Sequence, residues 1–248
     1  MENWNNLNKL LNLNVKSTRL KEQEAQSLVE LCQKGEKEEI KKLLKGGANI
    51  NCFADNATPL ISCIENDKYD LAIYLLSIRA SISYKTKEDS DDAFWYALKN
   101  KKHDFLSLFV MNRCILSIDN TTRQSALIYA TVQSDIKAVT ILLGHHRINV
   151  NERDGIGNTA LHHNVSKQSP TQEDLEIGQM LIAAGADTDA RNMEGKTPEE
   201  EALDFSAKSM LLANKMDKQL EEKEEIIPEV DLDDKNTITK TAGNKIKI

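Results

Sequence analysis

The chain has 248 residues, a formal net charge of -7 and only 5% aromatic residues. An acidic chain is poorly suited to nucleic acid, because phosphate binding needs a basic face. No apolar run approaches the roughly 18 residues of a membrane-spanning helix. We therefore expect neither a nucleic-acid partner nor a membrane span.

The four cysteines form no Cys-x-x-Cys pair and no metal-ligand spacing. We expect all four to be reduced thiols, as in a cytoplasmic protein. The N-terminus also lacks the charged-then-apolar pattern of a signal peptide. Cytoplasmic localisation is the resulting expectation.

Residues 1–22 precede any repeat and are expected to form a capping segment. Five apolar residues there could share one helical face, namely Trp4, Leu7, Leu10, Leu11 and Leu13. The alternative is a helix that binds a membrane surface or a partner. Its polar face carries Asn instead of Lys or Arg, which argues against the membrane.

A short motif recurs along the chain, and its copies begin at Thr58, Asp92, Ser125, Thr159 and Thr197. The intervals are 34, 33, 34 and 38 residues. A period near 33 with a Thr-Pro-Leu-His type of motif indicates stacked helical hairpins. Thr58 can cap a helix with its hydroxyl, and Pro59 suits the first helical position.

The repeat domain is expected to span residues 23–213, with repeats near 25–51, 56–83, 90–117, 123–151, 157–190 and 195–213. The fifth repeat contains an expected loop insertion over 166–174. The polar run 199–201 suits a terminal repeat whose outer face meets water. Residues 214–248 are expected to be an acidic helix to about Ile227, followed by a disordered tail after Pro228.

The motifs resemble those of the ankyrin-repeat family. The resemblance rests on Asp154-x-x-Gly157-x-Thr159-Ala160-Leu161-His162, Thr58-Pro59-Leu60, Gly46-Gly47-Ala48-Asn49-Ile50-Asn51, Ile148-Asn149-Val150-Asn151 and Gly185-Ala186-Asp187. It implies an all-α solenoid of about six helix-turn-helix units with short β-hairpin connections. It also implies binding of other proteins by hairpin tips and inner helices, without chemistry of the fold's own.

The middle repeats depart from this pattern. Arg79 and Arg113 stand where the family has the glycine that ends a helix, and Arg123 replaces a hairpin glycine. A non-glycine residue at positive φ costs about 1 kcal/mol. These turns are therefore expected to be strained or differently shaped.

One residue per repeat, two after the motif leucine, is expected to face a partner. The five residues are Glu30, Ser62, Tyr96, Tyr129 and His163. Stacked layers place them about 10 Å apart on a concave wall. Tyrosine is a favoured interface anchor. We predict that Tyr96, Tyr129 and His163 bind the partner, flanked by Trp95 and Lys99.

Alternatives remain for each residue. The rings of Tyr96 and Tyr129 could pack between inner helices, Trp95 could fill the core, and His162 could bond the hairpin backbone. The hairpin tips are a second candidate surface, with solvated turns as the alternative; they are Asp55, Asn120, Asp154 and Glu194. Among these tips, we predict that Asp154 binds the partner.

The sequence shows no motif of a catalytic, metal-binding or phosphate-binding site. The pairs His145-His146 and His162-His163 have no further ligands at metal spacing. There is no glycine-rich phosphate loop and no Gly-x-Ser-x-Gly. We expect no metal, no cofactor and no enzyme activity.

The leading hypothesis is a monomeric, non-enzymatic module that binds a partner protein. One alternative is a bacterial effector delivered into a host cell by type IV secretion, because the glutamates of 221–225 resemble the acidic block of such effectors; a plain solvated tail would look the same. Further alternatives are an anchor for a catalytic subunit and an inhibitor that covers another protein's site.

Overall fold

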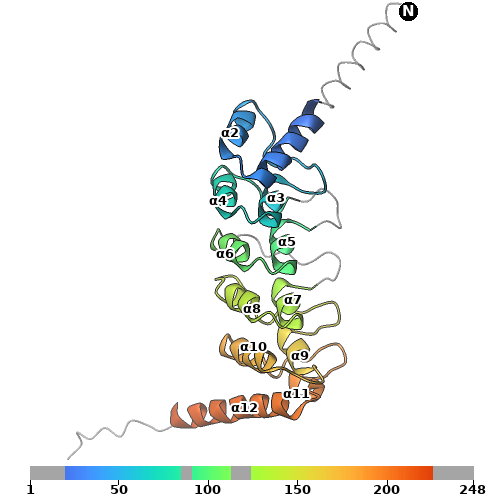
Figure 1. Ribbon diagram of the computed structural model, residues 1–248. Helices are drawn as coiled ribbons and strands as arrows, with labels where there is room; N and C mark the ends of the chain where they lie inside the picture. The colour runs from blue at the N-terminus through green and yellow to red at the C-terminus, as the bar shows by residue number, and fades with distance from the viewer. Residues whose placement is uncertain (1–19, 85–90, 113–123, 226–248) are drawn as a thin grey trace, which may run out of the picture.

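The computed structural model describes residues 20–84, 91–112 and 124–225, and its helices form two columns (Figure 1). The inner column holds a helix over residues 20–34, α3 (Pro59–Glu65), α5 (Ala93–Lys99), α7 (Ala126–Val132) and α9 (Ala160–Val165). The outer column holds α2 (Lys37–Lys45), α4 (Tyr69–Ser77), α6 (His103–Met111), α8 (Ile136–Leu143) and α10 (Gln172–Ala183). The predicted stack of helical hairpins is confirmed.

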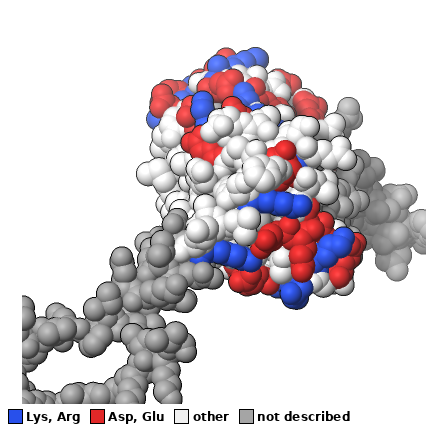
Figure 2. Space-filling view, turned by 90° about the horizontal axis from the view of Figure 1, so that it is seen from below, with Lys and Arg blue, Asp and Glu red and all other residues white. Residues whose placement is uncertain are grey.

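The sixth unit closes the stack with the short α11 (Pro198–Glu201) and the long α12 (Phe205–Glu225), which crosses beneath α10 (Figure 1). Figure 2 views this end and shows a broad uncharged area beside groups of charged side chains. No helix within the described ranges is long and apolar enough to cross a membrane.

The inner helices begin directly after the residues whose side chains cap them. The Thr58 hydroxyl accepts a hydrogen bond from the Ile61 N–H at 3.1 Å, and Asp92 accepts one from the Trp95 N–H at 2.9 Å. Thr159 and Thr197 each form a reciprocal capping box. These caps satisfy amide groups that a helix leaves free at its start.

Residues in the left-handed backbone conformation, with positive φ, make the turns within the repeats. Gly35, Asp67, Lys101 and Ser134 occupy one such position in the first four repeats, with φ between 52° and 82°. Arg79 has φ 71°, so its turn keeps the glycine-type shape with an unfavourable residue. The expected strain is therefore present at Arg79. Arg113 and Arg123 lie outside the described residues.

The core runs continuously along the stack between the two columns. Its largest fully buried side chains include Trp95, Phe94, Phe109, Leu142 and Leu161. The inner helices α3, α5, α7 and α9 each contact the next one in the stack, and the outer helices α6, α8 and α10 do the same. Stacking therefore continues through the middle repeats despite their altered turns.

The connections are tight turns and not strands within the described ranges. One isolated bridge joins Ala54 and Ala57. In the later repeats the Asp154 N–H donates to the Asn158 carbonyl at 2.9 Å. The β-hairpin connections implied by the resemblance are thus reduced to hydrogen-bonded turns.

Two expected boundaries fall inside helices. The boundary after residue 22 lies within the helix over 20–34, and the boundary after residue 213 lies within α12. Buried α12 residues belong to the core, so the solenoid extends past the expected limit. Residues 1–19 and 226–248, including most of the predicted cap and tail, lie outside the described residues.

The inserted loop of the fifth repeat is shorter than expected. It covers 166–171, and Asp174 belongs to the first turn of α10. Asp174 is buried and accepts hydrogen bonds from Lys167 at 2.5 Å and Ser134 at 2.6 Å. Burial opposes its ionisation, but these donors outweigh burial and hold its pKa at about 2. The insertion is thereby tied to the fourth repeat.

Candidate protein-binding surface

Three of the predicted contact residues lie on neighbouring inner helices. Tyr96 is on α5, Tyr129 on α7 and His163 on α9, and each is half-buried. Since α5 packs on α7 and α7 on α9, the three side chains occupy equivalent positions in successive layers. We call Tyr96, Tyr129 and His163 the ring row.

The ring row does not extend into the second repeat. Ser62 is fully buried, and its hydroxyl donates to the Val29 carbonyl at 3.2 Å. Glu30 is exposed on the first helix. Of the five residues in the predicted row, only the last three are therefore half-buried.

Tyr96 lies close to a residue that the sequence did not indicate. Its hydroxyl is near the carboxylate of Glu65 at the end of α3. Burial first, and then the negative charge of Glu65, raises the pKa of the Tyr96 hydroxyl. The ring also lines a cavity of about 200 Å³ whose other walls include Phe53, Ile61 and Tyr84. This cavity gives the ring row a recess at one end.

Trp95 lies in the core and not on the surface. It is 0% exposed and contacts Phe94 edge-to-face at a centroid distance of 6.0 Å. It meets the Tyr129 ring in the same way at 5.8 Å and 87°. The alternative of a core filler is correct, and the expectation that Trp95 flanks the binding surface is wrong. Its edge-to-face contact instead orients Tyr129.

Lys99 borders the ring row and is engaged within the chain. Its ammonium lies 2.8 Å from the Asp91 carboxylate and 5.6 Å from the Trp95 ring centroid. The side chain remains about one quarter exposed. Lys99 and Asp91 therefore present a paired charge beside the aromatic residues.

His163 is joined to Asp154 in the preceding hairpin turn. Its Nε2 lies 2.7 Å from Asp154 Oδ2, while Asp154 Oδ1 accepts the N–H groups of Ile156 and Asn158. Burial acts against the charge, but the His163 bond and these amides hold the pKa of Asp154 below its ordinary value. The Asp154 side chain is only 7% exposed, so it shapes the turn and positions His163 instead of projecting as a tip.

The neighbouring His162 has a structural role. Its Nδ1 accepts from the Thr159 N–H at 3.2 Å, and its Nε2 donates to the Lys196 carbonyl in the next hairpin turn, also at 3.2 Å. The ring is 1% exposed. The alternative in which His162 bonds the hairpin backbone is confirmed.

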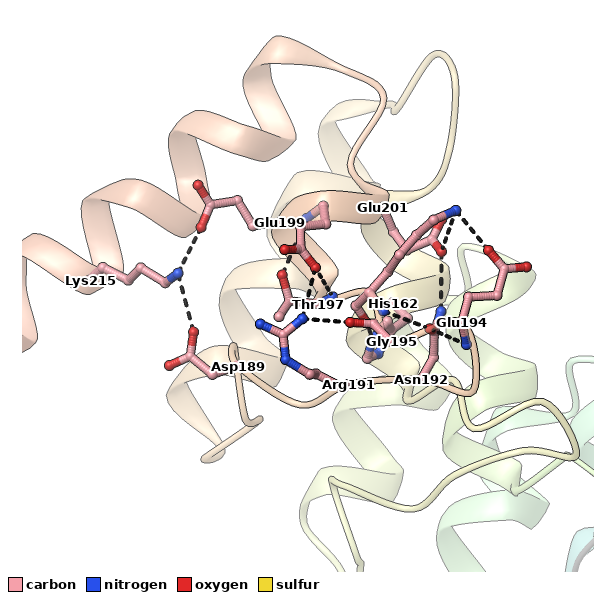
Figure 3. A network of polar contacts seen from close by, with 12 residues as sticks. His162, Asp189, Arg191, Asn192, Glu194, Gly195, Thr197, Glu199, Glu201 and Lys215 are labelled. Atoms are coloured by element: carbon pink, nitrogen blue, oxygen red, sulfur yellow. Dashed lines mark hydrogen bonds and ion pairs between the residues drawn. The ribbon is translucent and has the colours of Figure 1, made fainter.

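The last hairpin turn carries a network of ion pairs (Figure 3). Lys196 pairs with Glu194 at 2.7 Å, and Arg191 donates to the Gly195 carbonyl. From α12, Lys215 reaches Glu199 at 2.7 Å and Asp189 at 3.2 Å (Figure 3). These contacts fasten the final hairpin turn to α12, and they engage the Glu194 tip within the chain.

The remaining hairpin tips and histidines do not form a binding site within the described residues. Asp55 is hydrogen-bonded to Gln26, and Asn120 lies outside the described residues. In the described part of the chain, no three His, Cys, Asp or Glu side chains are grouped to hold a metal ion. The rings of His145 and His146 stand 4.8 Å apart, and His145 is buried.

A second groove lies on the outer column and was missed from the sequence. It has a volume of about 440 Å³ and lies between α2 and α4, lined by Lys41, Leu44, Lys45, Tyr74 and Ile78 among others. The Lys41 ammonium stands 5.7 Å from the Tyr74 ring centroid. The sequence signal for this groove was the spacing of Lys37, Lys41 and Lys45, because residues four apart share one face of a helix.

Comparisons with known proteins agree with this architecture. Residues 94–192 match the family model described as ankyrin repeats, three copies. The chain therefore contains ankyrin repeats, and the solenoid is an ankyrin-repeat fold. Ankyrin repeats are typically non-enzymatic and indicate a protein-interaction module.

Solved structures share the fold at low sequence identity. An ankyrin repeat domain from Acinetobacter baumannii gives a TM-score of 0.65 at 22% identity, covering 76% of this chain and 97% of that one. A chain in the complex of a Bdellovibrio bacteriovorus predatory endopeptidase with an immunity protein gives 0.58 at 21%, covering 75% and 96%. At such identities the likeness shows the fold alone.

A curated relative matches over part of its length. An intracellular phospholipase A2 from Caenorhabditis elegans is 29% identical over 98 residues, which is 39% of this chain and 9% of that enzyme. This chain thus spans less than a tenth of the curated relative. The match supplies no basis for assigning phospholipase activity here.

Proposed function

We propose that the chain binds a partner protein through the ring row on its concave surface. The observation that carries the proposal is the fixed, half-exposed state of all three side chains. Tyr96 lines the cavity and lies close to Glu65, the Tyr129 ring packs against Trp95, and His163 is bonded to Asp154. Aromatic side chains that are already immobilised lose little entropy on binding, which suits them as interface anchors.

The surface favours a partner with an apolar anchor and polar rim groups. The cavity beside Tyr96 could accept an aromatic or branched side chain, since three of its walls are apolar or aromatic. Lys99 with Asp91, and His163 with Asp154, offer polar groups at the border. A folded surface loop or an extended peptide would fit this arrangement.

The test compares the wild type with a triple variant, Tyr96→Ala, Tyr129→Ala and His163→Ala. Immobilised chains are exposed to a lysate and the retained proteins are identified by mass spectrometry. The affinity of a purified candidate is then measured by calorimetry. We expect the triple variant to lose more than about 2 kcal/mol of binding free energy.

The matched control is a double variant in the outer groove, Tyr74→Ala with Ile78→Ala. This control should bind the partner with the affinity of the wild type. Thermal unfolding of the triple variant and of the control shows whether either has lost folded protein. Equal retention by the wild type and the triple variant would contradict the proposal. Loss only in the control would place binding on the outer groove.

The effector hypothesis concerns how the chain would reach a partner in a host cell. Residues 221–225 continue α12, whereas 226–248 lie outside the described residues. Deleting 226–248 therefore spares the residues that pack against the solenoid. Delivery that survives both this deletion and replacement of the 221–225 glutamates by glutamine would argue against secretion through this segment.

A further inference from the structure

The outer groove between α2 and α4 combines an apolar lining with basic side chains. The helices α6, α8 and α10 pack on one another more closely than α2 packs on α4, so the groove is a local opening in the outer column (Figure 1). Its volume is about 440 Å³. The apolar part of its lining consists of Leu44, Ala48, Ile50, Tyr74 and Ile78.

Three lysines follow the groove along α2, at positions 37, 41 and 45. Because they are four residues apart, they share one helix face at intervals of about 6 Å. The Lys37 ammonium lies 4.9 Å from the Tyr74 ring centroid, and the Lys41 ammonium lies 5.7 Å from it. The negative face of an aromatic ring attracts a cation, so Tyr74 holds these two charges beside the groove.

The positive charge beside the groove is only partly balanced. Lys41 is paired with Glu38 at 2.6 Å, and the Glu38 side chain is 75% exposed. Such a surface pair contributes little, so an incoming carboxylate can replace Glu38. In the described part of the chain no carboxylate pairs with Lys37 or Lys45, and both lysines are exposed. The groove is therefore a basic site on a chain whose net charge is -7.

We infer that the outer groove binds an extended acidic segment of a partner protein, in which carboxylates alternate with apolar side chains. Every second residue of an extended chain points to the same side, at intervals of about 6 to 7 Å, which matches the spacing of the lysines. The carboxylates then reach the lysines of α2, while the apolar side chains face Tyr74 and Ile78. A helix about 10 to 12 Å across is too wide for a groove of this volume.

The outer groove is separate from the ring row. The ring row lies on α5, α7 and α9 of the inner column, whereas the groove lies on the outer column (Figure 1). A segment in the groove therefore leaves the concave surface open. The chain could then hold two proteins at once, or bind one protein that reaches both sites with higher avidity. The inference does not depend on the proposed function of the ring row.

Fluorescence polarisation of the full chain with a labelled peptide tests the inference. The probe has about nine residues in which glutamate alternates with leucine. Two control probes carry lysine in place of glutamate, or serine in place of leucine. The wild type should bind the first probe saturably with a dissociation constant of about 1 to 100 µM that rises with salt. It should bind neither control probe.

Variants of the two surfaces separate this inference from the proposed function. Tyr74→Ala with Ile78→Ala should weaken probe binding about tenfold or more, because it removes the apolar wall of the groove. The triple variant of the ring row should bind the probe as the wild type does. The reverse result, with loss only in the triple variant, would overturn the inference.

Charge variants on α2 give a matched comparison. Lys45→Gln should weaken probe binding about threefold or more, and Glu38→Gln, which frees Lys41, should strengthen it about twofold. The control Lys42→Gln removes the same charge outside the groove, where Glu39 lies 2.6 Å from the lysine, and should leave the affinity unchanged.

Three results would overturn the inference. The first is no saturable binding of the glutamate–leucine probe up to about 1 mM. The second is a loss from Lys45→Gln no larger than that from Lys42→Gln. The third is binding of phosphatidylserine vesicles that the probe does not displace, which would make the groove a lipid site.

Discussion

The third and fifth repeats place different side chains at the same position. In the fifth, His162 bonds its own cap residue and the backbone of the next hairpin turn. In the third, Trp95 fills the core and contacts Phe94 and Tyr129. Both helices start from a capped N-terminus with similar backbone angles.

The difference shows that one backbone position can serve two purposes. A polar ring there fastens one layer to the next through a directed hydrogen bond. A large apolar ring there fills the space between layers and orients a tyrosine on the neighbouring helix. The repeat that departs most from the sequence pattern is therefore the one that supports the ring row.

The largest effect is expected from Trp95→Ala. Removing a fully buried indole should cost about 3 to 5 kcal/mol of unfolding free energy, measured by denaturant titration. Binding through Tyr129 should also weaken in the protein that remains folded. Trp95→Phe keeps an aromatic contact and serves as the milder control. A loss below about 1 kcal/mol would show that the indole is not needed for core packing.

His162→Ala should have an intermediate effect. It removes two buried hydrogen bonds and leaves the Lys196 carbonyl without this donor, at a cost of about 1 to 3 kcal/mol. Denaturant titration measures the loss, and amide exchange should increase first in the last hairpin turn. Uniform exchange across the chain would instead indicate a purely global effect.

The same histidine predicts a pH dependence. Burial lowers the pKa of His162, and burial also lowers that of His145. The unfolded chain therefore binds more protons than the folded chain as the pH falls below about 6.5. Stability should decrease in that window, and His162→Ala should show a smaller decrease than the wild type. Identical slopes would contradict the assignment.

Arg79→Gly should have the smallest effect and the opposite sign. Arg79 has φ 71°, and glycine adopts this conformation without the steric cost of a side chain. We expect a gain of about 0.5 to 1 kcal/mol, read from the denaturation midpoint. Gly185→Ala, at φ 91° in the fifth repeat, should lose a similar amount. A destabilised Arg79→Gly would mean that the arginine side chain makes a contact worth more than the strain.

The sequence by itself determined the period, the helix pairs and the caps. Thr58, Thr159 and Thr197 could be identified as caps because a capping bond joins residues three apart in the chain. Apolar spacing within each helix likewise depends on local geometry. These features require no knowledge of which layers touch.

Only the tertiary structure decided which rings are buried. Trp95 and Tyr96 are adjacent in sequence, yet one is enclosed and the other is half-exposed because neighbouring layers cover them differently. The closeness of Tyr96 to Glu65 also depends on how one layer is placed against another. Periodicity gives the direction of a side chain within its own helix, but burial depends on what the rest of the chain places against it.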